Sequence, residues 1–178
     1  MRIRTIATAG LTKNRFLVPV LASLLLVGAL SQGCAEKPKL DLKAVADKII
    51  KTFNTSDPVA IADLYAQDAV MIQPNEPAPV RGRAAILKSY ESFFKAFPVW
   101  KFDFNSILFS GDTIIFELVG HGTMTGPLVT PEGEIAPTGR SIDLKTAFFA
   151  KISPDGLIDE DRSYFDNTEL SKVLGLMK

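Results

Sequence analysis

The spacing of the apolar residues changes once along this chain, at Pro98, and that change limits the folds open to it. Before Pro98, apolar residues recur at helical spacing over residues 41–54 and 83–96, and a shorter helical stripe follows Asp57 and Pro58. After Pro98, apolar and polar residues alternate, as in strands that bury one side. Helices followed by a run of strands predict an α+β fold, with helices on one face of an antiparallel sheet.

The predicted strands lie close together in sequence, so they form a meander. Those of the meander cover residues 100–110, 113–123, 141–152 and 158–165, a separate short strand over 69–73 precedes the third helix, and a short closing helix follows at 167–174. A long, curled sheet of this kind, closed by three N-terminal helices, makes a cone with a hollow. Hollows of this kind are where small ligands bind.

The composition suits one folded domain. The chain has 178 residues, 47% of them hydrophobic and 22% charged. Basic and acidic residues balance at 20 each, but residues 1–33 hold four basic residues and no acid, so the remainder carries 16 against 20, a net charge of −4. That balance gives no electrostatic reason to expect nucleic acid or an anionic membrane surface as a partner.

The amino terminus has the composition of a secretory signal. Basic residues precede an apolar run over 16–30, which is shorter than the roughly 20 residues that span a bilayer. Cys34 is the only cysteine, so the chain can form no internal disulfide. We therefore expect a signal over 1–33, a tether over 34–40 and one folded domain over 41–178.

Residues 31–34 (SQGC) resemble the lipobox of bacterial lipoproteins. The resemblance implies lipid attachment to Cys34, cleavage before it, and an exported domain anchored to a bacterial membrane, with the outer membrane favoured by Ala35. The alternative is ordinary cleavage near Ala29, which would leave Cys34 as a free thiol on a flexible arm.

The segment 160–166 (EDRSYFD) is polar on both faces of its predicted strand. Successive side chains of a strand point to opposite faces. One face therefore carries Glu160, Arg162, Tyr164 and Asp166, and the other carries Asp159, Asp161, Ser163 and Phe165. Two acids and a serine suit solvent, so we expect the face with Arg162, Tyr164 and Asp166 to point into the hollow.

Two interpretations of that inward face remain open. In the first, Asp166 is a general acid or base, Tyr164 donates a hydrogen bond to a developing oxyanion, and Arg162 orients the ligand. In the second, the charges are structural: Asp166 caps the helix that begins at Asn167, and Arg162 pairs with an acid such as Glu160.

His121 is the only histidine and shares a strand face with Glu117. Its ordinary pKa, near 6.5, suits acid–base chemistry, although a hydrogen-bonded surface histidine is the alternative. One histidine without cysteine ligands does not make a metal site, so we expect neither a metal nor another cofactor. The three glycines of residues 120–126 predict a bulge or bend.

Several segments together resemble the SnoaL-like polyketide cyclases of the nuclear transport factor two-like superfamily. They are 122–126 (GTMTG), 137–140 (PTGR), 155–160 (DGLIDE), 164–166 (YFD) and 170–176 (LSKVLGL). The resemblance covers 41–178 and implies the cone fold, with Asp166 matching that family's acid–base aspartate. Met124 and Arg162 stand where the family often has histidine and tryptophan.

These observations predict a membrane-anchored domain that binds a small, largely apolar molecule, with or without catalysis. The alternative is an enzyme of cyclase or isomerase type that uses Asp166. The predicted pocket residues are Tyr90, Trp100, Glu117, Met124 and Arg162, and the open face of the sheet could pair two copies of the chain.

Overall fold

The computed structural model describes residues 40–130 and 133–177, within a compact unit formed by residues 38–178. The predicted signal over 1–33, the lipidation site Cys34 and all of the tether except Leu40 lie outside the described residues. In the described part of the chain, no helix is both long and apolar enough to cross a membrane.

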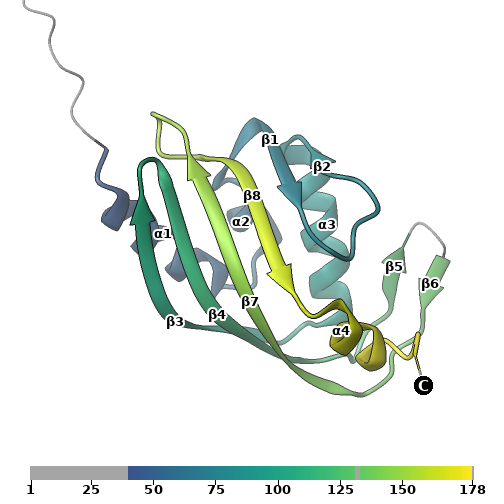
Figure 1. Ribbon diagram of the computed structural model, residues 1–178. Coiled ribbons are helices and arrows are strands. Elements are labelled where there is room, and N and C mark those ends of the chain that lie inside the picture. The colour runs from purple at the N-terminus through teal and green to yellow at the C-terminus, as the bar shows by residue number, and fades with distance from the viewer. Residues whose placement is uncertain (1–39, 131–132, 178) are drawn as a thin grey trace, which may run out of the picture. The chain divides into compact units, whose positions relative to one another are not determined.

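A mixed α+β architecture with a curved six-stranded sheet dominates the described unit (Figure 1). The strand order is β2-β1-β8-β7-β4-β3, with these bounds: β1 Tyr65–Ile72, β2 Val80–Arg81, β3 Trp100–Ser110, β4 Thr113–Thr123, β7 Ser141–Ile152 and β8 Ile158–Phe165. Neighbouring strands are antiparallel, except that β1 and β8 are parallel. The expectation of an entirely antiparallel sheet was therefore wrong at this pair, which joins strands from distant parts of the sequence.

Three helices lie behind the sheet in the view of Figure 1: α1 Leu42–Phe53, α2 Pro58–Ala62 and α3 Arg83–Ala96. The carboxylates of Asp41 and Asp57 each accept two backbone N–H groups at the start of α1 and α2. Pro58 occupies the first turn of α2, where its missing N–H is not needed. The local sequence thus fixes where both helices begin.

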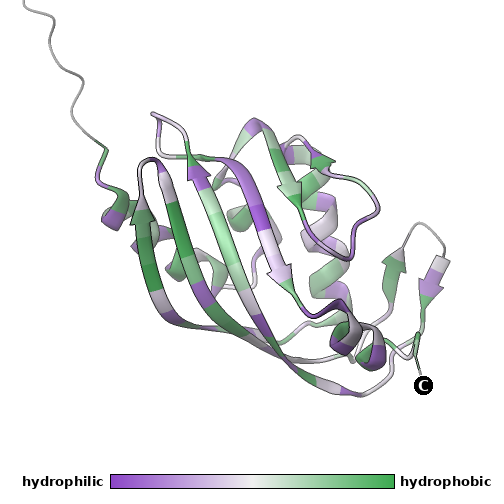
Figure 2. Cartoon of the chain, in the orientation of Figure 1, coloured by the Kyte–Doolittle hydropathy of each residue, from purple (hydrophilic) through white to green (hydrophobic). Residues whose placement is uncertain are grey.

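The side of the sheet that faces the helices is mostly apolar along β4 and β7. In β4 and β7 alternate residues are buried, and the ring of Phe53 from α1 packs against those of Tyr90, Phe102 and Phe148 at centroid distances of 5.4 to 6.0 Å. Figure 2 shows apolar segments along these strands and on the helices. We call this side the inner face and the opposite side the outer face.

Two small elements flank the end of the sheet. The ribbon of β5 (Leu128–Thr130) and β6 (Gly133–Ile135) contacts α3, and α4 (Asn167–Val173) follows β8 directly. Thr138 donates a hydrogen bond to the carbonyl of Val173, and so holds α4 against the segment that follows β6.

The glycines of β4 serve close packing. A Cβ at Gly120 or Gly122 would lie 2.4 or 2.2 Å from the indole ring of Trp100, which covers both positions. The pairing of β4 with β7 runs through them without a shift, and the irregularity of this part of the sheet lies in β3, between Phe104 and Ser106. The predicted bulge or bend is therefore absent at Gly120 and Gly122, whereas the chain does bend at Gly126, just after β4 ends.

Candidate acid–base site at Asp161

Asp161, in the middle of β8, points to the inner face and is 1% exposed. Ser163 shares that face and is also buried, whereas Tyr164 is 57% exposed and Arg162 lies on the same outer side. The predicted orientation of the strand was therefore wrong. Buried carboxyl groups need hydrogen-bond partners, and those of Asp161 come from other elements as well as from its own strand.

Two hydroxyl groups donate hydrogen bonds to the Asp161 carboxyl group, and a third is linked to it through one of them. Tyr65, at the start of β1, donates to Oδ2 at 2.8 Å, and Ser163 donates to Oδ1 at 3.0 Å. The hydroxyl of Tyr90, on α3, lies 2.8 Å from that of Tyr65. Because the Tyr65 proton goes to Asp161, Tyr90 is the donor to Tyr65, and a chain of hydrogen bonds runs from α3 through β1 to β8.

Burial sets the protonation of this cluster. Loss of water raises the pKa of Asp161 to about 7, although the hydrogen bonds from Tyr65 and Ser163 act in the opposite direction. Burial and the nearby Asp161 charge raise the pKa of both Tyr65 and Tyr90, so both phenols stay protonated. No cation pairs with Asp161 among the described residues. The carboxyl group can therefore gain and lose a proton near neutral pH.

Exposure rises along the inner face of β8 toward α4. Asp161 is 1% exposed and Ser163 is 9% exposed, while Phe165 and the inward-facing Thr146 beside it are partly exposed. The Ser163 side of the cluster is thus the side nearest to solvent.

The family model of the SnoaL-like domain matches residues 46–160. The chain belongs to the SnoaL-like domain family. This match includes Tyr65 and Tyr90 and ends just before Asp161.

Solved structures with the same fold agree with this assignment. A SnoaL-like polyketide cyclase of Jannaschia sp. CCS1, assigned as such without proof of activity, is 15% identical, with a TM-score of 0.63 over 76% of this chain and 94% of that chain. AclR of Streptomyces galilaeus, described as a hydroxylase, also without proof of activity, is 21% identical. Its TM-score is 0.62, over 76% of this chain and 81% of that chain. IdmH of Streptomyces antibioticus, a proposed polyketide cyclase, is 24% identical, with a TM-score of 0.58 over 76% and 99%. No curated protein matches the chain in sequence.

Asp166, which the family resemblance matched to a catalytic aspartate, lies outside the interior of this SnoaL-like domain. It is exposed and caps α4, accepting the backbone N–H groups of Thr168 and Glu169. These two hydrogen bonds lower its pKa. The structural interpretation of Asp166 therefore accounts for its position.

The other two members of the predicted inward face pack on the outer face. The Tyr164 ring contacts that of Phe149 at 5.7 Å, and Arg162 pairs with Glu160 at 3.1 Å. The ion pair is the one that the structural interpretation expected for Arg162.

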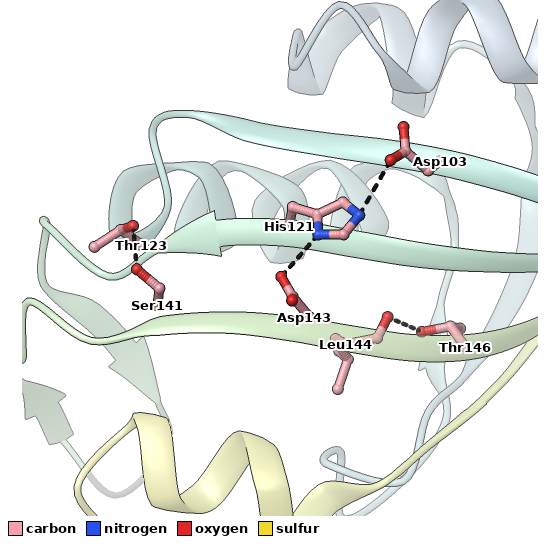
Figure 3. A network of polar contacts seen from close by, with 7 residues as sticks. All are labelled: Asp103, His121, Thr123, Ser141, Asp143, Leu144 and Thr146. Carbon is pink, nitrogen blue, oxygen red and sulfur yellow. Dashed lines mark hydrogen bonds and ion pairs between the residues drawn. The ribbon is translucent and has the colours of Figure 1, made fainter.

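His121 lies on the outer face between two carboxylates (Figure 3). Its Nδ1 is 2.7 Å from Asp143, and its Nε2 is 3.2 Å from Asp103. The hydrogen bond with Asp143 is the main reason that the pKa of His121 is raised. The imidazole borders a shallow hollow of about 550 Å³, away from Asp161. No group of side chains suited to a metal ion occurs in the described ranges.

The predicted pocket residues separate into three places. Tyr90 belongs to the Asp161 cluster, Trp100 and Met124 are buried in the core, and Glu117 is exposed on the outer face with Arg162. Glu117 was therefore placed on the wrong side of the sheet. The residues that the sequence analysis missed are Tyr65, Asp161 and Ser163.

Proposed function

We propose that this SnoaL-like domain binds a small, largely apolar molecule that carries a carbonyl or hydroxyl oxygen, and that Asp161 exchanges a proton with it. The observation that carries the proposal is the buried Asp161 carboxyl group, with a pKa of about 7 and no cation partner among the described residues. Such a group serves equally well as acid and base at neutral pH.

Two tyrosines are joined to this carboxyl group by a chain of hydrogen bonds. Tyr65 donates to Asp161 Oδ2, and Tyr90 donates in turn to Tyr65, so the phenols stabilise the carboxylate that remains when Asp161 gives up its proton. Protonated phenols in a dry site are effective donors to an oxygen that gains negative charge. The rings of Phe53 and Phe94 beside Tyr90 suit the apolar part of a ligand.

The ligand enters along the inner face of β8, from the side of Phe165 and Thr146. Exposure increases in that direction, and the Ser163 hydroxyl is the first polar group of the cluster that a ligand meets. Because the cluster is closed in this conformation, binding requires side chains at that end to move.

A reaction of the cyclase or isomerase type agrees with this chemistry. IdmH is a proposed polyketide cyclase, and SalBIII, an epoxide hydrolase/cyclase-like enzyme with a role in pyran ring formation in salinomycin, shares the fold at 18% identity and a TM-score of 0.58. Proton transfer next to a carbonyl or hydroxyl is the step that a single tuned carboxyl group can supply.

We also propose that the domain is exported and anchored through Cys34. The support is the SQGC pattern at 31–34 after an apolar run, with a single cysteine in the chain. Expression in a bacterial host should place the chain in the membrane fraction, and Cys34→Ser should release it. Recovery of both forms in the soluble fraction would contradict the anchor.

Proton transfer can be tested without the natural substrate. The probe is 2-tetralone, a planar apolar ketone, whose exchange of α-hydrogens for deuterium in D₂O is followed by ¹H NMR with the full chain in detergent. The wild type should accelerate exchange, Asp161→Asn should lower the rate by about 100-fold or more, and Asp166→Asn should leave it unchanged. Exchange that survives in Asp161→Asn, or a wild type no faster than buffer, would contradict the proposal.

A further inference from the structure

Two large apolar side chains are exposed at one corner of the sheet. Leu108 is 60% exposed and Phe109 is 49% exposed, near the end of β3, the strand that ends the sheet order. The two residues are adjacent, so their side chains point to opposite faces. Phe109 lies opposite the buried Ile114, which places it on the inner side, and Leu108 lies on the outer side. We call Leu108 and Phe109 the apolar corner.

The apolar corner lies at the end of the sheet where the described chain begins. At the end of β7, the backbone N–H of Ile152 donates a 2.8 Å hydrogen bond to the carbonyl of Asp112 in the β3–β4 turn. Gly156, in the β7–β8 turn, lies beside Leu40, because a Cβ at this glycine would be 3.5 Å from the leucine side chain. Figure 1 shows both turns and the start of α1 at this end of the sheet.

The tether limits how the domain can lie on a membrane if Cys34 carries the lipid. Six residue steps separate Cys34 from Leu40, and a fully extended chain covers at most about 21 Å over that length. Strand β7 runs away from this end for 12 residues, which is about 40 Å. The anchor therefore keeps the end with Leu40 close to the bilayer, whereas the opposite end, with β5 and α4, can stay clear of it.

The chemistry of the apolar corner suits a lipid surface. Apolar side chains on both faces of one strand cannot both be covered by a flat protein surface, whereas the interfacial region of a bilayer surrounds the end of an element that enters it. The charges beside the corner, Asp112 in the turn and Lys151 opposite Thr113, have opposite signs. The contact therefore depends on burial of apolar side chains and not on the charge of the lipid.

We propose that the apolar corner inserts into the interfacial region of the bilayer to which Cys34 is anchored. The domain then stands on the end of the sheet that holds the β3–β4 and β7–β8 turns. Phe165 and Thr146, where the ligand is proposed to enter, lie toward the opposite end, so the ligand comes from the aqueous phase and not from the lipid. This inference rests on the proposed anchor and is independent of the chemistry at Asp161.

A fluorescent label tests whether the corner touches lipid. The chain is expressed in a bacterial host and purified from the membrane fraction. Cys34 is the only cysteine and is acylated under the proposal, so Phe109→Cys adds the one free thiol, which is labelled with the fluorophore NBD. In phosphatidylcholine vesicles the label should lose most of its fluorescence when doxyl-labelled phosphatidylcholine, a quencher within the lipid, is included. Val129→Cys is the matched control: Val129 is 51% exposed but lies on β5, at the other end, and its label should stay bright.

A charge at the corner tests whether apolar contact, and not the tether alone, holds it in the lipid. A label at Leu108→Cys should be quenched like the label at position 109. Adding Phe109→Asp to that chain should remove most of the quenching, because a carboxylate resists transfer from water, whereas Val129→Asp should leave it unchanged. Added salt should also leave the quenching unchanged.

The possible results separate this inference from the proposals on which it depends. A membrane-bound chain whose label at position 109 stays bright would overturn the inference and leave the anchor intact. Equal quenching at positions 109 and 129 would also overturn it, as would a label that is shielded from water but not quenched by the doxyl lipid, which would indicate a protein contact. Recovery of the wild type in the soluble fraction would contradict the anchor, and the inference would fail with it. None of these results affects the deuterium exchange assigned to Asp161.

Discussion

Tyr65 donates a 2.8 Å hydrogen bond to Asp161 across the only parallel pair of strands in the six-stranded sheet, although 96 residues separate the two in sequence. This bond places a phenol from the first strand beside a buried carboxyl group of the last. The long-range pairing of β1 with β8 therefore assembles the candidate site. Single substitutions of Tyr65 or Asp161 should change how the stability of the domain depends on pH.

The stability of the domain should fall as pH rises from 4 to 7. The pKa of Asp161 is raised in the folded state, so the folded state binds more protons than the unfolded state in this window, and ionisation costs stability until the folded pKa near 7 is passed. The loss is on the order of 4 kcal/mol. Denaturant unfolding of the full chain in detergent at several pH values measures it.

Asp161→Asn removes the ionisable group and should abolish that fall. The variant should be more stable than the wild type at pH 8 and no more stable at pH 4. Ser163→Ala keeps the ionisable group, so the fall should remain and should extend to higher pH, because the Ser163 hydrogen bond lowers the pKa of Asp161. A wild type whose stability is flat from pH 4 to 7 would show that Asp161 is not buried with a raised pKa.

Tyr65→Phe should raise the pKa of Asp161 further, because the hydrogen bond from Tyr65 favours the charged carboxylate. The pH at which stability stops falling would then move upward. Tyr164→Phe removes the same hydroxyl from an exposed tyrosine on the same strand and should leave the curve unchanged. If stability depends on pH in the same way in Tyr65→Phe and Tyr164→Phe, the hydrogen bond from Tyr65 does not affect the pKa of Asp161.

His121 should add a second fall of stability in the same direction as that of Asp161, at higher pH. Its pKa is raised when folded, so its contribution is complete below its unfolded pKa near 6.5 and is lost as pH rises through the folded pKa. The two effects separate in an Asp161→Asn background, where the remaining loss of stability on the alkaline side should disappear with His121→Gln. A loss that persists in the double variant would assign it to another group.

Asp166 should act only on α4. Asp166→Ala removes the acceptor for the backbone N–H groups of Thr168 and Glu169, so these amides should exchange with solvent faster, while Asp166→Asn keeps a capping oxygen and most of the protection. Hydrogen exchange measured by NMR distinguishes the two variants. Equal protection in all three proteins would exclude the cap.

Features of the sequence that act locally predicted the structure well. The carboxylates of Asp41 and Asp57 lie at the helix starts where they were expected, and the change of period at Pro98 separates α3 from the long strands. The alternative assignment of Asp166 as a helix cap also depended on local sequence, and the structure agrees with it.

The orientation of β8 could not be predicted in this way. Both faces of the strand carry polar groups, and the choice between them depends on which face finds partners. The phenols that make burial of Asp161 tolerable come from Tyr65 and Tyr90, on β1 and α3. Tyr65 reaches Asp161 because β1 pairs in parallel with β8. The residues near Asp161 in the sequence do not indicate that pairing.

The most direct test of the account is an NMR titration of the aspartate carboxyl carbons in the ¹³C-labelled chain, with Asp161→Asn and Asp166→Asn used to assign the two signals. The account predicts a midpoint of about 7 for Asp161 and a midpoint below the ordinary aspartate value for Asp166. An Asp161 signal that titrates at the ordinary aspartate value or below would contradict a buried acid–base group at this position.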